Sequence, residues 1–398
     1  MSDVVIIGAG LVGCAVAARL AEEGFTVTLI DQAEVVAGAS GANLSLVLWS
    51  DAEPGVSLEL TRQAWDEFPA EMASLGEVEF RRLHTLGLVL EGDDPSKVLT
   101  GCGHLTAAGF KTEIVDVNAV RELEPAVDTT GVIAGVYQLQ AAVNPFRVTL
   151  AYADRARAAG AKVLTGARVT GFKLGRNDGT DGAGLARITA AETTAGPVRG
   201  GLFILAAGAW TRTLALSAGV DLPEYHIIGE ACVTEAVPPL LHGLVGETGS
   251  RRVPFELEIA AHDGDGRQLR LVEFAAIQTL SGNLVVGQVS HGGPDLGQGV
   301  RPGSLRNLAA GLVRRLPVTR SASIIRAWAK PVPFTPDHQP IIGPVKSRPN
   351  LFIASGLKSA FIITPLMSRL IAKYIVSGQA GPLSVFTPDR FEERNHAR

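Results

Sequence analysis

A glycine pattern near the amino terminus constrains the fold more than any other feature of the sequence. Residues 3–7 form a short β-branched run, typical of a strand that is buried on both faces. Gly8, Gly10 and Gly13 follow at once in the spacing Gly-x-Gly-x-x-Gly. They lead into an alanine-rich, helix-favouring segment over residues 14–23. A glycine-rich turn between a buried strand and a helix is expected.

Each part of this pattern has a physical role in binding a dinucleotide. The first glycine makes the turn, the second lets the backbone approach a pyrophosphate, and the third lets the helix pack on the strand. The helix N-terminus offers N–H groups and a positive dipole to the anion. Asp31, after a second expected strand over residues 25–30, can accept hydrogen bonds from a ribose diol, and an acid here disfavours NADP. The alternative is an ordinary tight strand-to-helix turn.

Composition excludes several other classes of protein. The 398 residues are 46% hydrophobic and 19% charged, which suits two or three globular domains and excludes a disordered or fibrous chain. The net charge of −4 argues against nucleic-acid binding, which needs a basic face. The three cysteines are far apart and form no Cys-x-x-Cys pair, so no disulfide framework, iron–sulfur cluster or other metal site is predicted. A reducing cytoplasm is the expected compartment.

The uncharged run over residues 4–18 resembles the apolar part of a signal peptide. No basic segment precedes it, its glycines disfavour a membrane helix, and it is too short to span a bilayer. No other apolar run approaches spanning length. The sequence therefore predicts no transmembrane segment.

The rest of the chain alternates helices and strands. Asn144 and Pro145 are expected to open a helix, as its N-cap and first helical residue. The other expected elements are an amphipathic helix over 58–75, a strand over 86–90, a hairpin over 168–191 with a polar loop at 175–184, a buried strand over 201–206 and a hairpin over 271–288. The order of elements is therefore strand, helix and strand, then an inserted region, a helix, a β-meander and a strand that returns to the first sheet.

This order and its motifs resemble the D-amino-acid oxidase and glycine oxidase superfamily of FAD-dependent oxidoreductases. The resemblance extends from residue 3 to about 378. It rests on the glycine pattern with Asp31, the small-residue loop 38–43, Glu124 with Pro125, residues 143–145, 161–169, 206–210 and 328–343, Ser355 with Gly356, and Thr364 with Pro365. The loop 356–361 is most similar to that of opine oxidase and hydrogen cyanide synthase catalytic subunits.

The resemblance implies a mixed α/β and α+β fold. A Rossmann-like FAD-binding domain of the glutathione-reductase type would comprise residues 1–45, 140–215 and 322–398. A discontinuous substrate domain with an antiparallel sheet would comprise 46–139 and 216–321. FAD is expected to be bound non-covalently, because no cysteine lies beyond Cys232 to form a cysteinyl–flavin bond. The expected cofactor-binding residues are Gly8, Gly10, Leu11, Val12, Gly13, Asp31, Gln32, Ala39, Ser40, Asn43, Val169, Ala207, Gly208, Trp210, Gly343, Gly356, Leu357, Ser359, Ala360 and Phe361.

The resemblance also supplies candidates for the substrate site. In this family a Trp-x-Gly-x-Arg-Pro stretch supplies an arginine for the substrate carboxylate, and Lys330 is assigned to that position, where a point charge would replace a bidentate fork. Lys358, in the loop expected to face the flavin, is the second catalytic candidate. His226, Glu273 and Gln278 are expected on strands that line the substrate cavity, with purely structural roles as the alternative.

The implied reaction is dehydrogenation of a C–N bond in an amino-acid-like substrate of the opine, imino-acid or glycine type, with hydride transfer to flavin N5. Thr364 and Pro365 are expected to open a helix that ends at Gly378, and its N-terminus would face the flavin pyrimidine ring.

Three functions remain open at this point. The first is such a dehydrogenase or oxidase, including a self-sufficient glycine or D-amino-acid oxidase that uses oxygen. The second is a non-catalytic, FAD-bearing subunit of a redox complex. The third is an NAD-dependent dehydrogenase, which the C-terminal flavin-type segment disfavours. The loop resemblance favours redox partner subunits and a cytoplasmic location, peripheral to the inner membrane through a partner.

Overall fold

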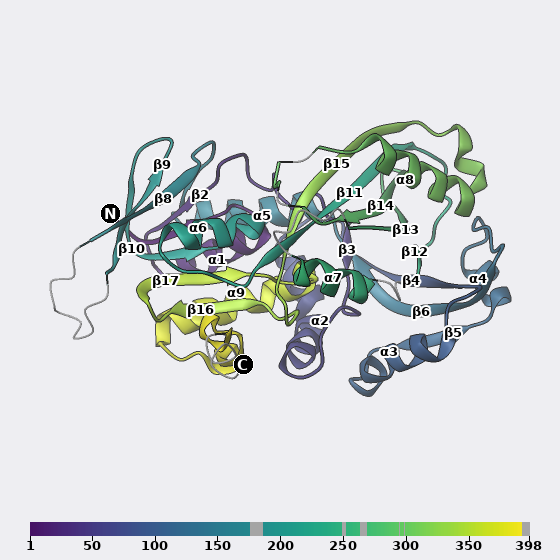
Figure 1. Cartoon of the computed structure of the whole chain (residues 1–398), viewed down its shortest axis with the longest axis horizontal. Coiled ribbons are helices and arrows are strands. Elements are labelled where there is room, and N and C mark those ends of the chain that lie inside the picture. Colours follow the sequence, from purple (N-terminus) through teal and green to yellow (C-terminus); the bar gives the residue numbers. More distant parts are fainter. Residues whose placement is uncertain (176–185, 249–251, 263–268, 294, 298, 392–398) are drawn as a thin grey trace.

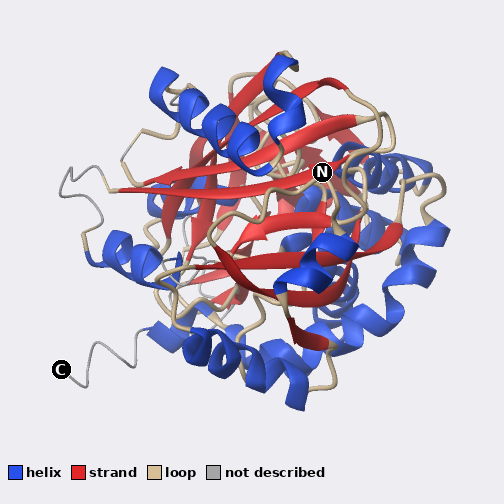
Figure 2. Ribbon diagram, turned by 90° about the vertical axis from the view of Figure 1, so that its right-hand side faces the viewer, coloured by secondary structure: helices blue, strands red, loops and turns tan. Residues whose placement is uncertain are grey.

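Two large sheets lie side by side in an elongated molecule (Figure 1). The computed structural model describes residues 1–175, 186–248, 252–262, 269–293, 295–297 and 299–391. In a view turned by 90°, the strands run through the middle of the molecule and most helices lie around the outside (Figure 2). The loop expected at 175–184 falls, except for Gly175, outside the described residues.

The first sheet has eight strands, and its core is parallel. Its main path runs β16, β17, β10, β1, β2, β7, with β16 antiparallel at one edge. The bounds are β1 Ser2–Ile7, β2 Val27–Ile30, β7 Lys162–Leu164, β10 Val198–Leu205, β16 Ile341–Val345 and β17 Arg348–Ser355. The antiparallel hairpin of β8 (Val169–Leu174) and β9 (Ile188–Thr193) joins through β10, as the sequence predicted.

Both faces of this sheet are covered. Alternate residues of β1 pack into two different hydrophobic cores, which is why the strand reads as an unbroken apolar run. One core holds helices α1 (Leu11–Glu22), α5 (Pro145–Ala158) and α9 (Ala360–Ser377). The other holds the β8–β9 hairpin and α6 (Thr211–Ser217). The glycine loop between β1 and α1 therefore opens at the carboxyl edge of a parallel sheet, between layers.

Two helix starts were expected from the sequence, and one of them is found where it was expected. Asn144 caps α5 as expected, because its Oδ1 accepts the backbone N–H groups of Phe146 at 3.1 Å and Arg147 at 3.2 Å. Helix α9 begins four residues before the expected start at Thr364, and Pro365 lies inside it. The residues of this extra turn are apolar and buried in the core with α1, so tertiary packing extends the helix.

Helix α9 also corrects the expectation that no apolar run approaches spanning length. Its 18 residues have a mean hydropathy of 1.4, which by length and composition is enough to cross a membrane. Of the helix, 56% is buried inside the structure, where it contacts α1 and α2 (Val56–Ser74). This is the environment of a core helix.

The second sheet has nine strands in the order β15, β11, β14, β13, β12, β4, β6, β3, with β5 also paired to β6. All neighbours are antiparallel except β12 and β4. The bounds are β3 Leu46–Val47, β4 Arg81–Leu90, β5 Thr112–Val115, β6 Val132–Ala142, β11 Tyr225–Ala236, β12 Leu244–Glu247, β13 Arg270–Gln278, β14 Asn283–His291 and β15 Ile324–Phe334. The expected hairpin over 271–288 is confirmed as β13–β14.

The remaining elements connect and cover the sheets. They are α3 Pro95–Ala107, α4 Val117–Leu123, α7 Arg252–Ala261, α8 Pro302–Arg315 and the 3₁₀ turns η1 Gly208–Trp210, η2 Pro317–Ser321, η3 Gly381–Phe386 and η4 Pro388–Phe391. Strand β15 belongs to the second sheet, although its residues lie in the segment 322–398 expected to bind the cofactor. Helix α2, grouped with the substrate segments, packs on α9 of the first layer.

Candidate functional site

A single cavity of about 1940 Å³ joins the glycine loop of the first sheet to one face of the second sheet. Small-molecule pockets commonly measure roughly 300–1,000 Å³, so this cavity has room for one large ligand and a second, smaller one. Its walls come from the loop after β1, the loop 38–43, several strands of the second sheet and the loop before α9. Segments far apart in the sequence thus share one space.

The glycine loop is shaped by close backbone contacts. Gly8 has a φ of +108°, and a Cβ there would lie 2.3 Å from the carbonyl oxygen of Ala206. A Cβ on Gly13 would lie 1.8 Å from the carbonyl oxygen of Gly8, so only glycine lets α1 approach the end of β1. Gly13 does not line the cavity and acts through this packing. Ser40 closes the loop from the other side, because its Oγ accepts the Leu11 N–H at 2.9 Å.

Asp31 lines the cavity and also braces this loop. Its Oδ2 accepts the backbone N–H of Ala9 at 2.7 Å, and its Oδ1 accepts that of Ala33 at 2.8 Å. Burial raises the pKa of the carboxyl above its ordinary value, although these hydrogen bonds act in the opposite direction. The contact of Asp31 with a ribose stays a prediction; the bracing of the loop is an additional role.

Most of the residues expected to bind the cofactor line this one cavity. They are Gly8, Gly10, Leu11, Val12, Asp31, Gln32, Ala39, Ser40, Asn43, Val169, Ala207, Gly208, Trp210, Gly356, Leu357, Ser359, Ala360 and Phe361. Gly343 does not line the cavity but packs against the C-terminal turns, so its contact with the cofactor stays a prediction. A Cβ on it would lie 3.3 Å from Pro388 Cδ.

The loop before α9 is held in an unusual backbone conformation. Ser359 is left-handed, with a φ of 48°, and its Oγ donates to Asp51 Oδ2 at 2.7 Å instead of capping the helix. The first residues of α9 line the cavity, so the N-terminus of this 18-residue helix directs its positive dipole into the cavity.

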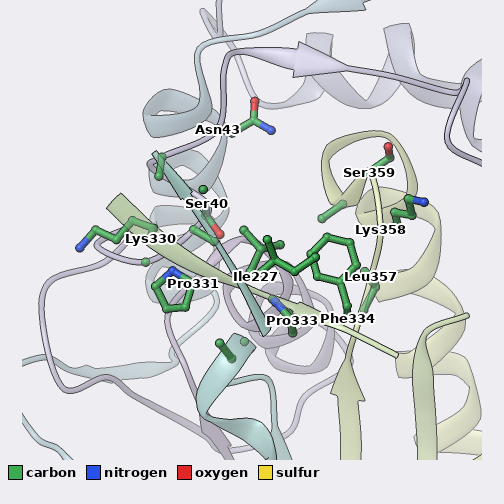
Figure 3. A pocket seen from close by; sticks show the side chains of 18 of the residues that line it. Ser40, Asn43, Ile227, Lys330, Pro331, Pro333, Phe334, Leu357, Lys358 and Ser359 are labelled. Atoms are coloured by element: carbon green, nitrogen blue, oxygen red, sulfur yellow. The ribbon is translucent and has the colours of Figure 1, made fainter. Parts of the chain in front are cut away.

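Lys330 and Lys358 lie on opposite sides of the pocket (Figure 3). Ile227, Phe334 and Leu357 lie between them, and both amino groups point away from these apolar side chains. The side-chain amino group of Lys330 has no hydrogen-bond or ion-pair partner within the described part of the chain. The spacing of the family stretch also corrects its assignment. Counted from Trp328, Lys330 stands at the glycine of Trp-x-Gly-x-Arg-Pro, and Val332 stands at the arginine.

Lys358 is neutralised by two carboxylates. Its Nζ lies 3.3 Å from Glu256 Oε2 and 3.9 Å from Glu53 Oε1. The Glu256 side chain is only 1% exposed. Burial would raise the pKa of Glu256, but the contact with His338 and the charges of Lys358 and Arg252 outweigh it and lower this pKa to about 2.

Sequence reasoning missed Arg252 and Glu256, which both line the cavity from α7. Arg252 Nε donates to Glu256 Oε1 at 2.6 Å, and Nη1 donates to Ser290 Oγ at 2.6 Å. Its Nη1 also lies 3.6 Å from Glu273 Oε2. The only sequence signal was an Arg–Glu pair at i and i+4, which is equally common on exposed helix faces.

The three other substrate-site candidates, Glu273, His226 and Gln278, differ in whether they line the cavity. Glu273 lines the cavity beside Arg252. His226 does not line it. Gln278 does not line it either, because its amide holds the neighbouring loop: Oε1 accepts the Leu240 N–H at 2.7 Å and Nε2 donates to the Pro238 carbonyl at 3.0 Å. His226 and Gln278 thus lie on strands β11 and β13, which contribute to the cavity wall as expected, but neither residue lines the cavity itself.

Comparison with known proteins places this site in context. The family model described as "FAD dependent oxidoreductase" matches residues 3–374. Mitochondrial dimethylglycine dehydrogenase of Mus musculus is 25% identical over 400 residues, which cover 95% of this chain and 43% of that protein. Hydrogen cyanide synthase subunit HcnC of Pseudomonas protegens is 28% identical over 278 residues, 68% of this chain and 57% of that protein. The chain thus spans less than half the length of the first relative.

A solved structure shows the same fold. L-proline dehydrogenase from P. horikoshii superposes with a TM-score of 0.81 at 22% identity, covering 98% of both chains. The match therefore includes both sheets.

Proposed function

Because the chain belongs to the family of FAD-dependent oxidoreductases, we propose that its cavity holds FAD non-covalently, in a Rossmann-type site of the glutathione-reductase kind. The residues fit this cofactor. Backbone atoms fill the positions that a Cβ on Gly8 or Gly13 would take, and Asp31 lies at the cavity wall after β2. We also propose that residues 1–45, 140–215 and 322–398 form most of the cofactor-binding domain.

The function that we propose is dehydrogenation of the C–N bond of an amino acid or N-substituted amino acid. One observation carries it: a single cavity connects the glycine loop to a wall that bears cationic side chains. Bound FAD supplies the hydride acceptor. Cationic side chains of the protein hold the substrate carboxylate. Ile227, Phe334 and Leu357 exclude water from the space between the cationic side chains and the bound cofactor. The N-terminus of α9 stabilises negative charge that develops at the cavity wall.

The test is anaerobic mixing of the purified flavoprotein with glycine, sarcosine, dimethylglycine, proline and D-alanine. At least one compound should bleach the flavin absorbance to the endpoint that dithionite defines. If no compound bleaches it while dithionite does, the chain is not an amino-acid dehydrogenase of this kind. That result would favour a non-catalytic FAD-bearing subunit.

The electron acceptor is a separate part of the proposal. The relative HcnC is by its name a subunit, and the three cysteines of this chain are too scattered for an iron–sulfur relay of its own. We therefore propose a partner subunit with further redox centres, and a cytoplasmic location that becomes peripheral to the inner membrane through that partner. Air admitted to the substrate-reduced chain should reoxidise it slowly. Reoxidation at the turnover rate with peroxide release would instead identify a self-sufficient oxidase.

A further inference from the structure

Four described residues that line the cavity are arginines or lysines: Arg168, Arg252, Lys330 and Lys358. Arg168 lies beside Val169, one of the residues expected to bind the cofactor. Lys358 is paired with two carboxylates. Arg252 also contacts two carboxylates, Glu256 and Glu273, but its guanidinium has five N–H donors where the Lys358 ammonium has three. Arg252 and Lys330 are therefore the two candidates for holding an anionic substrate.

The two candidates differ in their surroundings. The Arg252 guanidinium carbon lies 6.0 Å from the centre of the Phe334 ring, beside the apolar centre of the pocket. Lys330 precedes Phe334 by four residues on β15, which corresponds to about 13 Å along an extended strand. Its amino group points away from the apolar centre (Figure 3). Charge pairs are stronger in water-poor surroundings, so Arg252 offers the better-placed cation.

The guanidinium of Arg252 is held in one orientation. Glu256 accepts from Nε and Ser290 from Nη1, both at 2.6 Å. With its side-chain oxygen toward the guanidinium, Gln288 accepts from Nη1 at 2.6 Å and from Nη2 at 3.3 Å. Within the described residues, this longer contact is the only one that Nη2 makes. Nη2 therefore keeps donor capacity for one more acceptor.

We propose that Arg252 anchors the substrate carboxylate through the remaining donor of Nη2 and that Glu256 is the positioning residue that orients the guanidinium. The proposal rests on the proposed function. Glu256 divides its two oxygens between tasks: Oε1 holds Arg252, and Oε2 lies 3.3 Å from both Lys358 and His338. It thereby ties the anchoring arginine to the loop before α9, so that the carboxylate is held at a fixed distance from the cofactor side of the cavity.

Binding of an inert ligand pair tests this without turnover. Methoxyacetate is the ether analogue of sarcosine and cannot form an imine; methoxyacetamide is its neutral counterpart. Isothermal titration calorimetry of the FAD-containing protein should show that Arg252→Met weakens methoxyacetate binding at least about tenfold, the scale expected for a lost hydrogen bond to a charged group. Methoxyacetamide binding should change less than about twofold, because the anchor acts on charge.

Matched variants separate anchoring from positioning. Arg252→Lys should restore part of the methoxyacetate affinity, because a lysine keeps the charge but not the planar fork. Glu256→Gln should weaken methoxyacetate binding by about threefold or more and spare the amide. Arg306→Met and Glu258→Gln, both exposed and outside the cavity, are the controls and should match the unaltered protein.

Three results would overturn the proposal. They are loss of methoxyacetate binding in Lys330→Met but not in Arg252→Met, equal weakening of acid and amide, or no methoxyacetate binding by the unaltered protein. A different result separates this inference from the proposed reaction. If Arg252 carries carboxylate binding but no amine bleaches the flavin, the anchor stands and the proposed dehydrogenase function fails.

Discussion

A buried carboxyl directly before β11 should make the stability of this protein fall as the pH rises. Glu224 is 3% exposed, and neither of its carboxyl oxygens has a hydrogen-bond partner among the described residues. Burial raises the pKa of Glu224 from 4.5 to about 8, although the neighbouring Ser355 and the charge of Arg212 act in the opposite direction. The native state keeps the proton up to that pH, whereas the unfolded chain releases it near pH 4.5.

The sign and size follow from proton linkage. Between pH 4.5 and 8 the native state binds more protons than the unfolded state, so the free energy of unfolding falls as the pH rises. A pKa shift from 4.5 to about 8 corresponds to a total loss of unfolding free energy on the order of 5 kcal/mol, at about 1.4 kcal/mol per pH unit. The unfolding entropy of 398 residues is roughly 0.8 kcal/mol per kelvin, so this loss of unfolding free energy lowers the Tm by about 6 °C.

Glu224→Gln removes the titration while it keeps the shape of the side chain. The Tm of the variant minus that of the unaltered protein should rise by about 6 °C between pH 4.5 and pH 8 in differential scanning calorimetry, and then level off. Glu122→Gln, an exposed change on α4, is the control and should give a constant difference. A difference for Glu224→Gln that does not depend on pH would refute the reasoning, because Glu224 would then be ionised in the native state.

Three further predictions concern the cofactor site. Asp31→Ala should weaken FAD binding and also lower the free energy of unfolding by roughly 1.5–3 kcal/mol or more, because two backbone N–H groups lose a charged acceptor. FAD titration measures the first effect and urea unfolding the second. An unchanged unfolding curve would show that the hydrogen bonds of Asp31 to the loop contribute nothing to stability. Gly13→Ala should lower FAD content and Tm, because its Cβ would lie 1.8 Å from the Gly8 oxygen, whereas Gly103→Ala, which meets nothing within 4 Å, should not. Acid precipitation should release the flavin into the filtrate, and yellow colour retained in the pellet would indicate a covalent bond.

The parts of the fold that could be predicted from sequence are those whose signals are local. The glycine loop needs a strand, three glycines and a helix in succession, and every one of these lies within a few residues of the next. The cap at Asn144 is equally local, since the side chain bonds to backbone groups two and three residues ahead. Such features depend little on the rest of the chain.

The misplaced features depend on packing between distant segments. Thr364 and Pro365 carry a local start signal, but burial of the preceding apolar turn against α1 outweighs it. Gln278 looks like a cavity residue until the fold places it against the loop after β11. Arg252 gains its candidate role only when β14 brings Ser290, and β15 brings Phe334, to the same helix.

The first sheet has a consequence for synthesis of the chain. Strand β10 pairs with β1 on one side and with β17 on the other, so the sheet combines residues 2–7, 198–205 and 348–355. Until β17 leaves the ribosome, β10 presents an open parallel edge, and open edges invite pairing between chains. The loop at 356–361 emerges later still. FAD can therefore stabilise the chain only after residue 361 has been synthesised, and long-range pairing of this kind folds slowly. Aggregation during expression should depend on how long the unpaired edge persists, and a supply of extra flavin cannot shorten that interval.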